Sequence, residues 1–352
     1  MTETKYTYTP DIPEVFRCRV PLPGTLQAFV NNGALREDLV NDRFTLKSQG
    51  AAGIEFIVAP ACIVDDTIQV ISFRDSSDTS DTSDTSDINF ISNITFGRES
   101  SSSTLLCTHT LSLDKFKTDE VINIKAEQGS RSHIVIMQNE HNESAHKFQI
   151  NISVEEGAFL RINFITLHGA LLENEVVVNL NGKGASCELN GAYLMDGSQI
   201  IKTNIMMNHL EPECYSSQLF KGILDDSAKA YFSGRIVVAK DAQKTQAYQA
   251  NHNLLISPAA KAYAQPQLEI YADDVKCSHG ATSGRLDEMG LFYMRSRGIS
   301  GTEAKLLQQL AFVYDVLEKI ENQHLRDRLH DLVESRLRGE FGHCANCSMN
   351  CC

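Results

Sequence analysis

The stretch KFQINISVEEGAFLRINFITL, Lys147 to Leu167, holds two β-rich runs on either side of the turn signal EEGA. Apolar side chains occupy every second position of the first run, from Phe148 to Val154. Successive side chains of a β-strand point to opposite faces, so these apolar side chains share one face. The stretch therefore predicts a half-buried strand, a turn and a second strand.

Runs of the same kind recur from about Val121 to Val275, each bounded by a turn signal. No helical pattern interrupts them, which argues against β-α-β units and leaves a sandwich, a barrel or a β-solenoid. In the turns, a small residue repeatedly follows Gly, Ser, Asp or Pro. Such loose self-similarity is typical of stacked coils and favours a solenoid slightly over a sandwich. These turns are Gly157-Ala158, Gly184-Ala185, Gly197-Ser198, Ser227-Ala228, Asp241-Ala242 and Pro258-Ala259.

After Gly284 the pattern becomes helical. LDEMGLFYMRSRG ends in basic residues and Gly298, which suits the end of a helix. SGTE, from Ser300 to Glu303, has the spacing of a capping box and predicts the start of a long helix. Apolar residues step by three or four along that helix and along a second one. They predict either a helical hairpin packed on the β body or a docking surface. They are Leu306, Leu310, Val313, Leu317 and Ile320, then Leu325, Leu329, Leu332 or Val333, and Leu337.

Two polar segments stand in the first third of the chain. DSSDTSDTSDTSD, Asp75 to Asp87, has no apolar side chain to bury, so we expect a mobile linking loop. ESSSST, Glu99 to Thr104, predicts a second, shorter polar break.

The composition narrows the class of partner. The 352 residues carry 32 basic and 45 acidic side chains, a formal net charge of −13. Nucleic acid and anionic membranes both require a basic surface, so neither is an expected partner. The N-terminal residues contain no apolar leader segment, and no apolar run approaches the roughly 18 residues of a membrane span. We therefore expect a soluble, cytoplasmic protein.

The segment DDVKCSHGATSG, Asp273 to Gly284, places a thiol and an imidazole two residues apart. If a strand runs through His279, then Asp273, Val275, Cys277 and His279 share one face. Three interpretations remain open: a Cys–His nucleophilic pair, a pair of ligands for a soft metal or an iron–sulfur cluster, or a half-buried cysteine beside a surface histidine. The chain contains no phosphate-binding G-x-x-x-x-G-K-[ST], no H-E-x-x-H and no G-x-S-x-G motif.

The C-terminal segment GHCANCSMNCC is a second candidate metal site. The thiols of Cys344, Cys347, Cys351 and Cys352 are ligand types for zinc or an iron–sulfur cluster, although the spacing is only partly that of a metal knuckle. The alternative is a mobile tail of reduced thiols. The other six cysteines are scattered singly, and we expect them to be reduced.

One long segment resembles a known family. NHNLLISPAAKAYAQPQLEIYADDVKCSHGATSGRLDEMGLFYMRSRGIS, Asn251 to Ser300, resembles the signature region of the SufB/SufD family, subunits of the SUF (SufBCD) iron–sulfur cluster assembly complex. KCSHGAT together with PQLEIYADDV is closer to the SufD branch than to SufB, whose equivalent segment reads more like Glu-His-Glu-Ala. A looser likeness extends over Asp11 to Gly339, and includes CTHT (Cys107–Thr110), LFKGILDD (Leu219–Asp226) and DAQKTQAYQ (Asp241–Gln249).

The resemblance implies a fold and a function. The fold would be mainly β, a right-handed parallel β-helix followed by a C-terminal α-helical region. The chain would be a non-enzymatic scaffold that pairs with the paralogue SufB through the β-helix and docks the ABC-type ATPase SufC through its C-terminal helices. His279 would lie at the cluster-assembly interface, with Cys277 secondary. No cofactor would be held stably by this chain alone, and an iron–sulfur cluster would form transiently between it and SufB.

Two alternatives stay open: a SufB-like homodimeric scaffold, and a thiol enzyme that uses Cys277 and His279. Family members usually carry an N-terminal helical domain, which here is expected to be reduced or missing. The expected division of the chain is an N-terminal segment leading into the β body (1–74), the polar loop and break (75–104), the β-helix core (105–284), the helical region (285–339) and the cysteine-rich tail (340–352).

Overall fold

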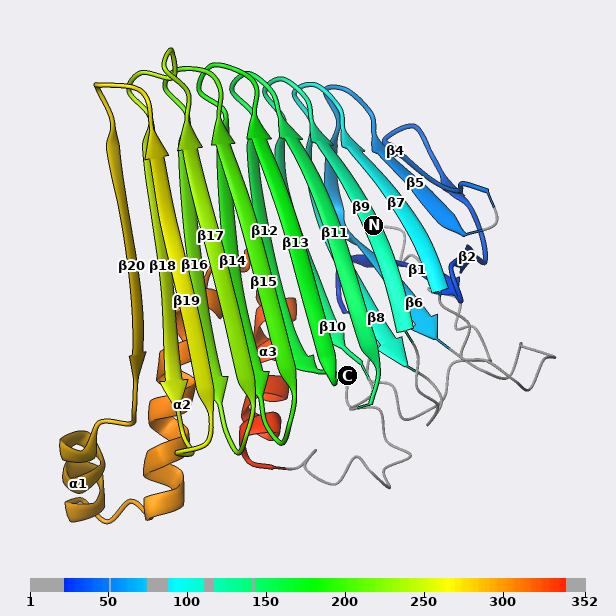
Figure 1. Ribbon diagram of the computed structural model, residues 1–352. Coiled ribbons are helices and arrows are strands. Elements are labelled where there is room, and N and C mark those ends of the chain that lie inside the picture. The colour runs from blue at the N-terminus through cyan, green and yellow to red at the C-terminus, as the bar shows by residue number, and fades with distance from the viewer. Residues whose placement is uncertain (1–21, 51, 75–87, 111–116, 141–142, 340–352) are drawn as a thin grey trace.

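The computed structural model describes residues 22–50, 52–74, 88–110, 117–140 and 143–339. The loop expected at Asp75–Asp87 and the tail at 340–352 lie outside these ranges. The chain forms two ten-stranded sheets that face each other, followed by three helices (Figure 1). From β6 onward it alternates between the sheets, with even-numbered strands in sheet A and odd-numbered strands in sheet B. This is a parallel β-solenoid, and it confirms the expected β-helix.

Each sheet has a spatial order that skips every second strand of the chain. Sheet A runs through β2 (Ala34–Leu35), β1 (Thr25–Asn31), β6 (Ile63–Arg74), β8 (Ser101–Thr110), β10 (Arg131–Asn139), β12 (Phe159–His168), β14 (Ser186–Met195), β16 (Tyr215–Leu224), β18 (Gln246–Leu255) and β20 (Lys276–Gly284). Sheet B runs through β19 (Lys261–Ile270), β17 (Lys229–Val238), β15 (Ile200–His209), β13 (Leu171–Leu180), β11 (Ala145–Val154), β9 (Lys117–Ala126), β7 (Ile88–Phe96), β5 (Gly53–Val58), β4 (Phe44–Ser48) and β3 (Leu39–Val40).

The solenoid begins earlier in the chain than residue 105, where the expected division of the chain placed the start of the β-helix core. Among the described strands only the pairs β1–β2, β3–β4 and β4–β5 are antiparallel, and β6 already pairs in parallel with β8. Strand β8 also includes residues 101–104, which were expected to form a polar break. Ser102 and Thr104 are buried there, and Thr104 lies in register with Ile134 of β10. Small hydroxyl side chains thus occupy inward positions of this strand. The polar composition of residues 101–104 therefore did not predict it.

The corners of the solenoid explain the recurring small residue in the turns. At several corners an alanine N–H donates to the carbonyl three residues earlier, as Ala158 does to Glu155 and Ala228 to Asp225. Each of these alanines is completely buried. The same geometry is found at Ala185 and Ala242. At the turns predicted with Ser198 and Ala259, those two residues are exposed, and the next residues, Gln199 and Ala260, make the bond and are buried.

Three helices follow the solenoid: α1 (Glu288–Ser296), α2 (Gly301–Leu317) and α3 (Gln323–Leu337). The side chain of Ser300 accepts from the N–H of Glu303 at 3.1 Å, which confirms the predicted helix start. α2 and α3 lie along the outer face of sheet A (Figure 1), where Leu310 and Val313 share one apolar cluster with Ile165 of β12. The predicted apolar faces therefore pack on the β body.

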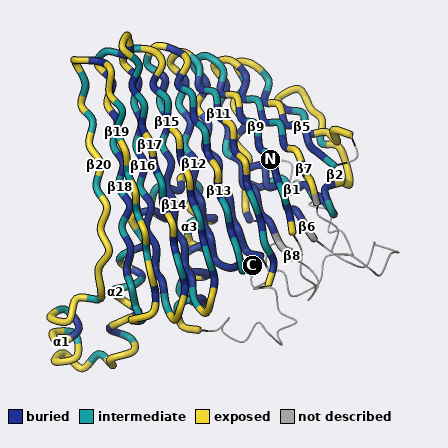
Figure 2. Tube along the Cα trace, viewed as in Figure 1, coloured by how far each residue is buried: buried dark blue, intermediate teal, exposed yellow. Residues whose placement is uncertain are grey.

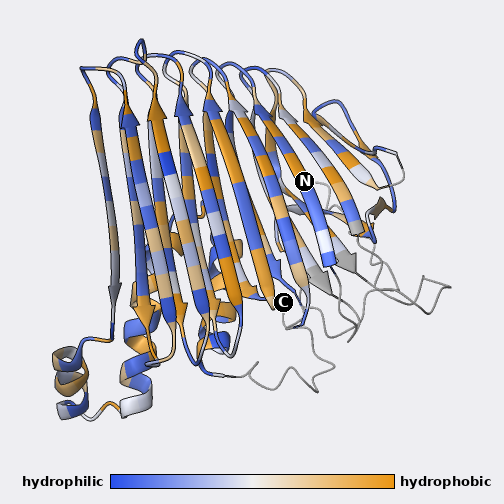
Figure 3. Cartoon of the chain, viewed as in Figure 1, coloured by the Kyte–Doolittle hydropathy of each residue, from blue (hydrophilic) through white to orange (hydrophobic). Residues whose placement is uncertain are grey.

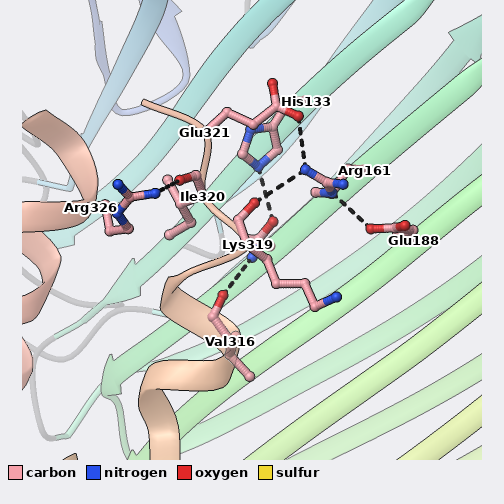
Figure 4. Close-up of polar contacts among 9 residues, drawn as sticks. His133, Arg161, Glu188, Val316, Lys319, Ile320, Glu321 and Arg326 are labelled. Atoms are coloured by element: carbon pink, nitrogen blue, oxygen red, sulfur yellow. Dashed lines mark hydrogen bonds and ion pairs between the residues drawn. The ribbon is translucent and has the colours of Figure 1, made fainter. Parts of the chain in front are cut away.

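Polar contacts attach the end of α2 to sheet A (Figure 4). The last turn of α2 has no basic residue, and its terminal carbonyls need partners. Arg161 of β12 donates from Nη1 to the carbonyl of Lys319 at 3.4 Å, and Asn163 donates to the carbonyl of Val316 at 3.2 Å. Arg161 is itself held between Glu188 and Glu321, at 2.8 Å from each. The solenoid thus supplies the positive charge that the helix end lacks.

The outer face of sheet B carries a row of asparagines. Nδ2 of Asn123 donates to Asn93 at 2.8 Å, and Nδ2 of Asn151 donates to Asn123 at 3.0 Å. Hydrophilic and hydrophobic residues alternate along the strands of sheet B (Figure 3), and the asparagines line a shallow groove of about 330 Å³. Because the amides bond to one another along the stack, we attribute this row to stabilisation of the sheet.

Candidate functional site

The last coil of the solenoid is its exposed end. β20 pairs with β18 and β19 pairs with β17, and among the described strands none pairs with the outer edges of β20 or β19. The two edge strands stand at one end of the stack (Figure 1), and β20 is exposed along much of its length (Figure 2). Side chains that point inward on β20 are therefore uncovered on one side.

Cys277 and His279 both lie on this inward face of β20. In the ladder, Cys277 is the partner of Ala247 and His279 is the partner of Gln249, and both partners are buried in the solenoid. Partners on neighbouring parallel strands point their side chains to the same face. The two-residue period therefore predicted the shared face of the thiol and the imidazole.

The strand is shorter than its sequence pattern indicated. β20 begins at Lys276, so Asp273 and Val275 precede it. The reason is a turn: the N–H of Asp274 donates to Oε1 of Gln243 at 2.9 Å, and the carbonyl of Asp274 accepts from Lys244 at 2.6 Å. Val275 still packs against the same interior cluster as Cys277.

The electrostatic setting does not activate the thiol. Cys277 is half-buried against the interior cluster, and this burial raises its pKa, although a backbone hydrogen bond at Ala247 acts in the opposite direction. A nucleophilic cysteine needs a lowered pKa. His279 is exposed. The pair therefore offers an uncharged thiol and an accessible imidazole at the rim.

Next to the open end of the solenoid, the interior changes from apolar to polar. Three buried side chains form a closed triangle of hydrogen bonds: the Tyr193 hydroxyl donates to Asn253 at 2.5 Å, Asn253 donates to Asn251 at 2.7 Å, and Asn251 donates to the Tyr193 oxygen at 3.2 Å. Burial raises the pKa of Tyr193 to about 12, against the effect of these hydrogen bonds. The triangle is a neutral, rigid element at physiological pH.

A second polar element includes the ladder partner of His279 on β18. Nε2 of Gln249 donates to Oε1 of Gln218 on β16 at 2.8 Å, and both amides are almost fully buried. The Gln249 side chain crosses the interior to sheet B, where a Cβ on Gly234 would lie only 2.0 Å from Nε2. The glycine thus makes the space that the amide occupies.

The outward face of the same strands is structural. Nδ1 of His252 on β18 contacts the hydroxyl of Thr282 on β20 at 2.7 Å, so His252 is a hydrogen-bonded structural residue. Nearby, the ammonium of Lys221 pairs with Asp315 of α2 and lies 4.9 Å from the centre of the Phe312 ring. These contacts fix α2 on the last coils.

Helix α1 carries an apolar patch away from the solenoid. Met289, Phe292 and Tyr293 on α1 and Leu307 on α2 are exposed by 75%, 68%, 58% and 40%. Leu291 faces the opposite way and is buried, which fixes the helix orientation. Exposed apolar groups gathered on one helix are typical of a protein contact.

The described part of the chain offers few side chains that could bind a metal ion together. In the described ranges, no three His, Cys, Asp or Glu side chains gather so that they could hold a metal ion. His279 and Cys277 supply at most two ligands, and the predicted ligands Cys344, Cys347, Cys351 and Cys352 lie outside the described residues. Nor is any helix in the described part long and apolar enough to span a membrane.

The polar residues under the rim were not predicted from the sequence. Gln249, Asn251 and Asn253 alternate with Ala250 and His252, so both faces of the strand are largely polar by composition. The two-residue period separates the two faces but does not say which one is inside. The only signal was the unusual polarity of an otherwise β-rich run.

Comparisons with known proteins agree with the resemblance. The family described as SUF system FeS cluster assembly, SufBD core domain, matches residues 83–312. The iron-sulfur cluster assembly protein SufD of Escherichia coli strain K12 is 36% identical over 199 residues, which cover 56% of this chain and 47% of that protein. An iron-sulfur cluster assembly SufBD family protein of Synechocystis is 33% identical over 201 residues, covering 56% of this chain and 44% of that protein.

A third relative is the iron-sulfur cluster assembly protein SufD of Plasmodium berghei, which is 29% identical over 212 residues. These cover 60% of this chain and 16% of that protein. The chain therefore spans less than half the length of each of these three relatives.

Proposed function

Because this chain belongs to the SufBD core-domain family of iron–sulfur cluster assembly proteins, we propose that it is a non-catalytic scaffold subunit of a SufBCD-type complex. In this proposal the open end of the solenoid pairs with SufB, the C-terminal helices dock the ATPase SufC, and a cluster forms transiently at the SufB interface in the cytoplasm. One observation carries the proposal: His279 is exposed in the inward row of an edge strand, where a second chain can complete its surroundings.

The backbone of β20 supports pairing with SufB. Lys276 donates to the carbonyl of Thr245, so alternate residues from Lys276 face β18. The N–H and C=O groups of the others, including those of Cys277 and His279, face the free edge. An uninterrupted row of unpaired backbone groups is a template for an added strand from another chain.

The free edge of β19 is a poorer template for an added strand than the free edge of β20. Lys261 and Tyr271 donate toward β17, which places the N–H groups of the even-numbered residues on the free edge. Pro266 is one of these positions and has no N–H to donate. We therefore place the main backbone pairing with SufB on β20, where it brings the partner's side chains next to His279.

His279 would be this chain's principal ligand at the shared site. The imidazole suits iron, and two ligands at most on this side require the partner to supply the rest. Cys277 would be secondary, because its half-buried thiol has a raised pKa and must lose its proton before it binds metal. The cluster is cargo of the complex, and this chain alone would hold no stable cofactor.

The patch of Met289, Phe292, Tyr293 and Leu307 is the proposed contact for SufC. The apolar faces of α2 and α3 are already buried against sheet A, which leaves α1 and the adjacent turn of α2 to meet the ATPase. Arg297 lies 5.2 Å from the centre of the Tyr293 ring and holds that aromatic side chain at the surface.

The test is co-expression of the chain with SufB and SufC of its own organism under anaerobic conditions. The mass of the complex and its iron content would be measured for the native chain, for His279→Ala and for His324→Ala. His324 is an exposed histidine on α3, so it controls for the loss of a surface imidazole. We expect all three complexes to have the same mass and only His279→Ala to lose iron.

Other results would favour the alternatives. A native chain that forms only a dimer with itself would replace the heterocomplex by a SufB-like homodimeric scaffold. Loss of an activity on alkylation of Cys277, with the complex intact, would favour the thiol enzyme. Equal iron content in native and His279→Ala complexes would remove His279 from the site.

The cysteines at 344, 347, 351 and 352 are a separate proposed metal site. Their thiols could bind zinc or a cluster independently of His279. Deletion of residues 340–352 should then lower the bound metal by a defined amount and leave the His279-dependent iron unchanged. Unchanged total metal after the deletion would exclude this site.

A further inference from the structure

Two buried amides near the open end are incompletely paired. Gln218 and Gln249 share one hydrogen bond, but Nε2 of Gln218 and Oε1 of Gln249 are buried and have no partner among the residues that the structure describes. Exchanging the amide nitrogen and oxygen of both side chains reverses the bond and still leaves one polar atom of each unpaired. A buried amide atom without a partner costs roughly 1–3 kcal/mol, so its retention needs an explanation.

The position of Gln249 suggests an explanation for its unpaired amide oxygen. Gln249 is the ladder partner of His279, and neighbouring strands lie about 4.8 Å apart. The Gln249 side chain cannot relax away from the rim, because Nε2 is bonded to Gln218 below it and the amide fills the space in front of Gly234. The amide is thus a fixed group on the strand next to β20, at the ladder position paired with the exposed His279.

We propose that Gln249 is a positioning residue for His279. Its free Oε1 accepts a hydrogen bond from one ring N–H of His279 and thereby selects the tautomer whose other nitrogen faces the open end. This inference rests on the proposed role of His279 as a ligand. It adds the residue that sets which nitrogen of the ring is offered to iron.

The chemistry favours a neutral acceptor at this place. A histidine ligand needs one nitrogen without a proton, and a hydrogen bond from the other nitrogen fixes both tautomer and ring orientation. An amide oxygen does this without adding a charge to the interior. Gln218 makes the same amide–amide bond but lies one strand further from His279, so it is the matched control.

The first experiment uses the full chain without partners. The tautomer of His279 would be read from ring nitrogen chemical shifts at about pH 8.5, where an ordinary imidazole is neutral, and the signal assigned by its loss in His279→Ala. Gln249→Met and Gln218→Met remove the same amide–amide bond with a side chain of similar length. Gln249→Glu keeps an acceptor at the site.

We expect a single tautomer in the native chain, in Gln218→Met and in Gln249→Glu, and a mixture of tautomers in Gln249→Met. A mixture in Gln218→Met to the same extent would show a general loosening of the interior and overturn the proposal. An unchanged spectrum in Gln249→Met would also overturn it. If Gln249→Met does not fold, a mixture of tautomers in the folded Gln249→Glu variant would overturn it.

The second experiment separates this inference from the proposed function. The affinity of the co-expressed complex for Fe²⁺ should fall about tenfold in Gln249→Met and stay unchanged in Gln218→Met. If His279→Ala leaves Fe²⁺ affinity unchanged, the proposed function fails, whatever the tautomer spectra show. If His279→Ala lowers the affinity and Gln249→Met does not, the proposed function stands and the positioning role is wrong.

Discussion

Arg161 on β12 and Glu321 after α2 are separated by 160 positions in the chain, and their side chains meet at 2.8 Å. The same guanidinium bonds Glu188 on β14 at 2.8 Å. One side chain of the solenoid therefore joins the turn between the two long helices to the middle of sheet A. The helical region is attached to the β body by specific polar contacts as well as by its apolar cluster.

Replacing Arg161 should loosen this attachment. Arg161→Met removes a largely buried charge and leaves Glu188 without that partner, so we expect a loss of about 1–3 kcal/mol in the free energy of unfolding. Glu321→Gln should cost less than about 1 kcal/mol, because the Glu321 side chain is 62% exposed. Urea unfolding, with hydrogen exchange of α2 and α3, measures both. Equal losses in the two variants would contradict the central role of Arg161.

His209 should make the protein less stable in acid. The ring is buried, and burial lowers its pKa to about 4. The unfolded chain binds a proton near pH 6.5 and the folded chain does not, so stability is complete above pH 6.5 and is lost as the pH falls toward 4. The loss amounts to about 3 kcal/mol over that interval. His209→Gln should flatten this part of the stability curve, whereas the exposed His324→Gln should not.

His146 should have the opposite effect on the pH dependence of stability: its contribution is lost as the pH rises. Burial lowers its pKa, but Glu120 and Glu140, at 3.5 Å and 3.0 Å from its two ring nitrogens, outweigh burial and raise the pKa overall. The protonated ring therefore contributes stability below pH 6.5, and this contribution is lost as the pH rises through the folded-state pKa. Denaturant midpoints measured from pH 6 to 9 should decline. Midpoints that stay level in the native chain would contradict the assignment.

Phe292 provides a test of the α1 patch. Phe292→Asp replaces an exposed apolar side chain, so the unfolding free energy should change by less than about 0.5 kcal/mol. Binding to SufC should weaken by about 2 kcal/mol or more if this ring is a central contact. Calorimetric titration of SufC into the native chain and the variant decides the matter. Glu288→Gln, a change of a polar side chain on the same helix, is the control, and equal affinities for all three chains would place the SufC contact elsewhere.

Gly222 tests the packing of the polar triangle. A Cβ at this position would lie 2.0 Å from the Tyr193 ring, so Gly222→Ala should overpack the interior and cost about 1–3 kcal/mol. Gly280→Ala on β20 is the matched change, because a Cβ there meets nothing within 4 Å. Thermal unfolding of both variants should separate them clearly. A small effect at Gly222 would mean that the Tyr193 ring can move aside.

Much of the architecture was predictable because it depends on local periodicity. The alternation beginning at Phe148, the small residue in each turn and the cap at Ser300 all act through near neighbours in the chain. They correctly indicated stacked strands followed by helices with buried faces. The two-residue period likewise placed Cys277 and His279 on one face. The choice of a β-helix over a sandwich came from the resemblance to a family.

The features that the sequence did not predict depend on distant parts of the chain. Thr104 is part of a strand because Ile134 pairs with it, and local composition could not report this partner. Gln249 is buried because Gly234, on the opposite sheet, leaves room for its amide. Which helix face stays exposed likewise depends on where the hairpin docks. Such features follow from register and packing, which a single sequence states only indirectly.

The linear stacking of the coils also has a consequence for how the protein folds. Each coil contacts only its neighbours, so folding should nucleate in the apolar middle of the stack and propagate outward. The coil that carries His279 has only one neighbouring coil and is partly exposed, so it should be added last. A chain that has not finished winding then offers no complete edge for the proposed pairing with SufB. The order of folding would in this way exclude immature subunits from assembly.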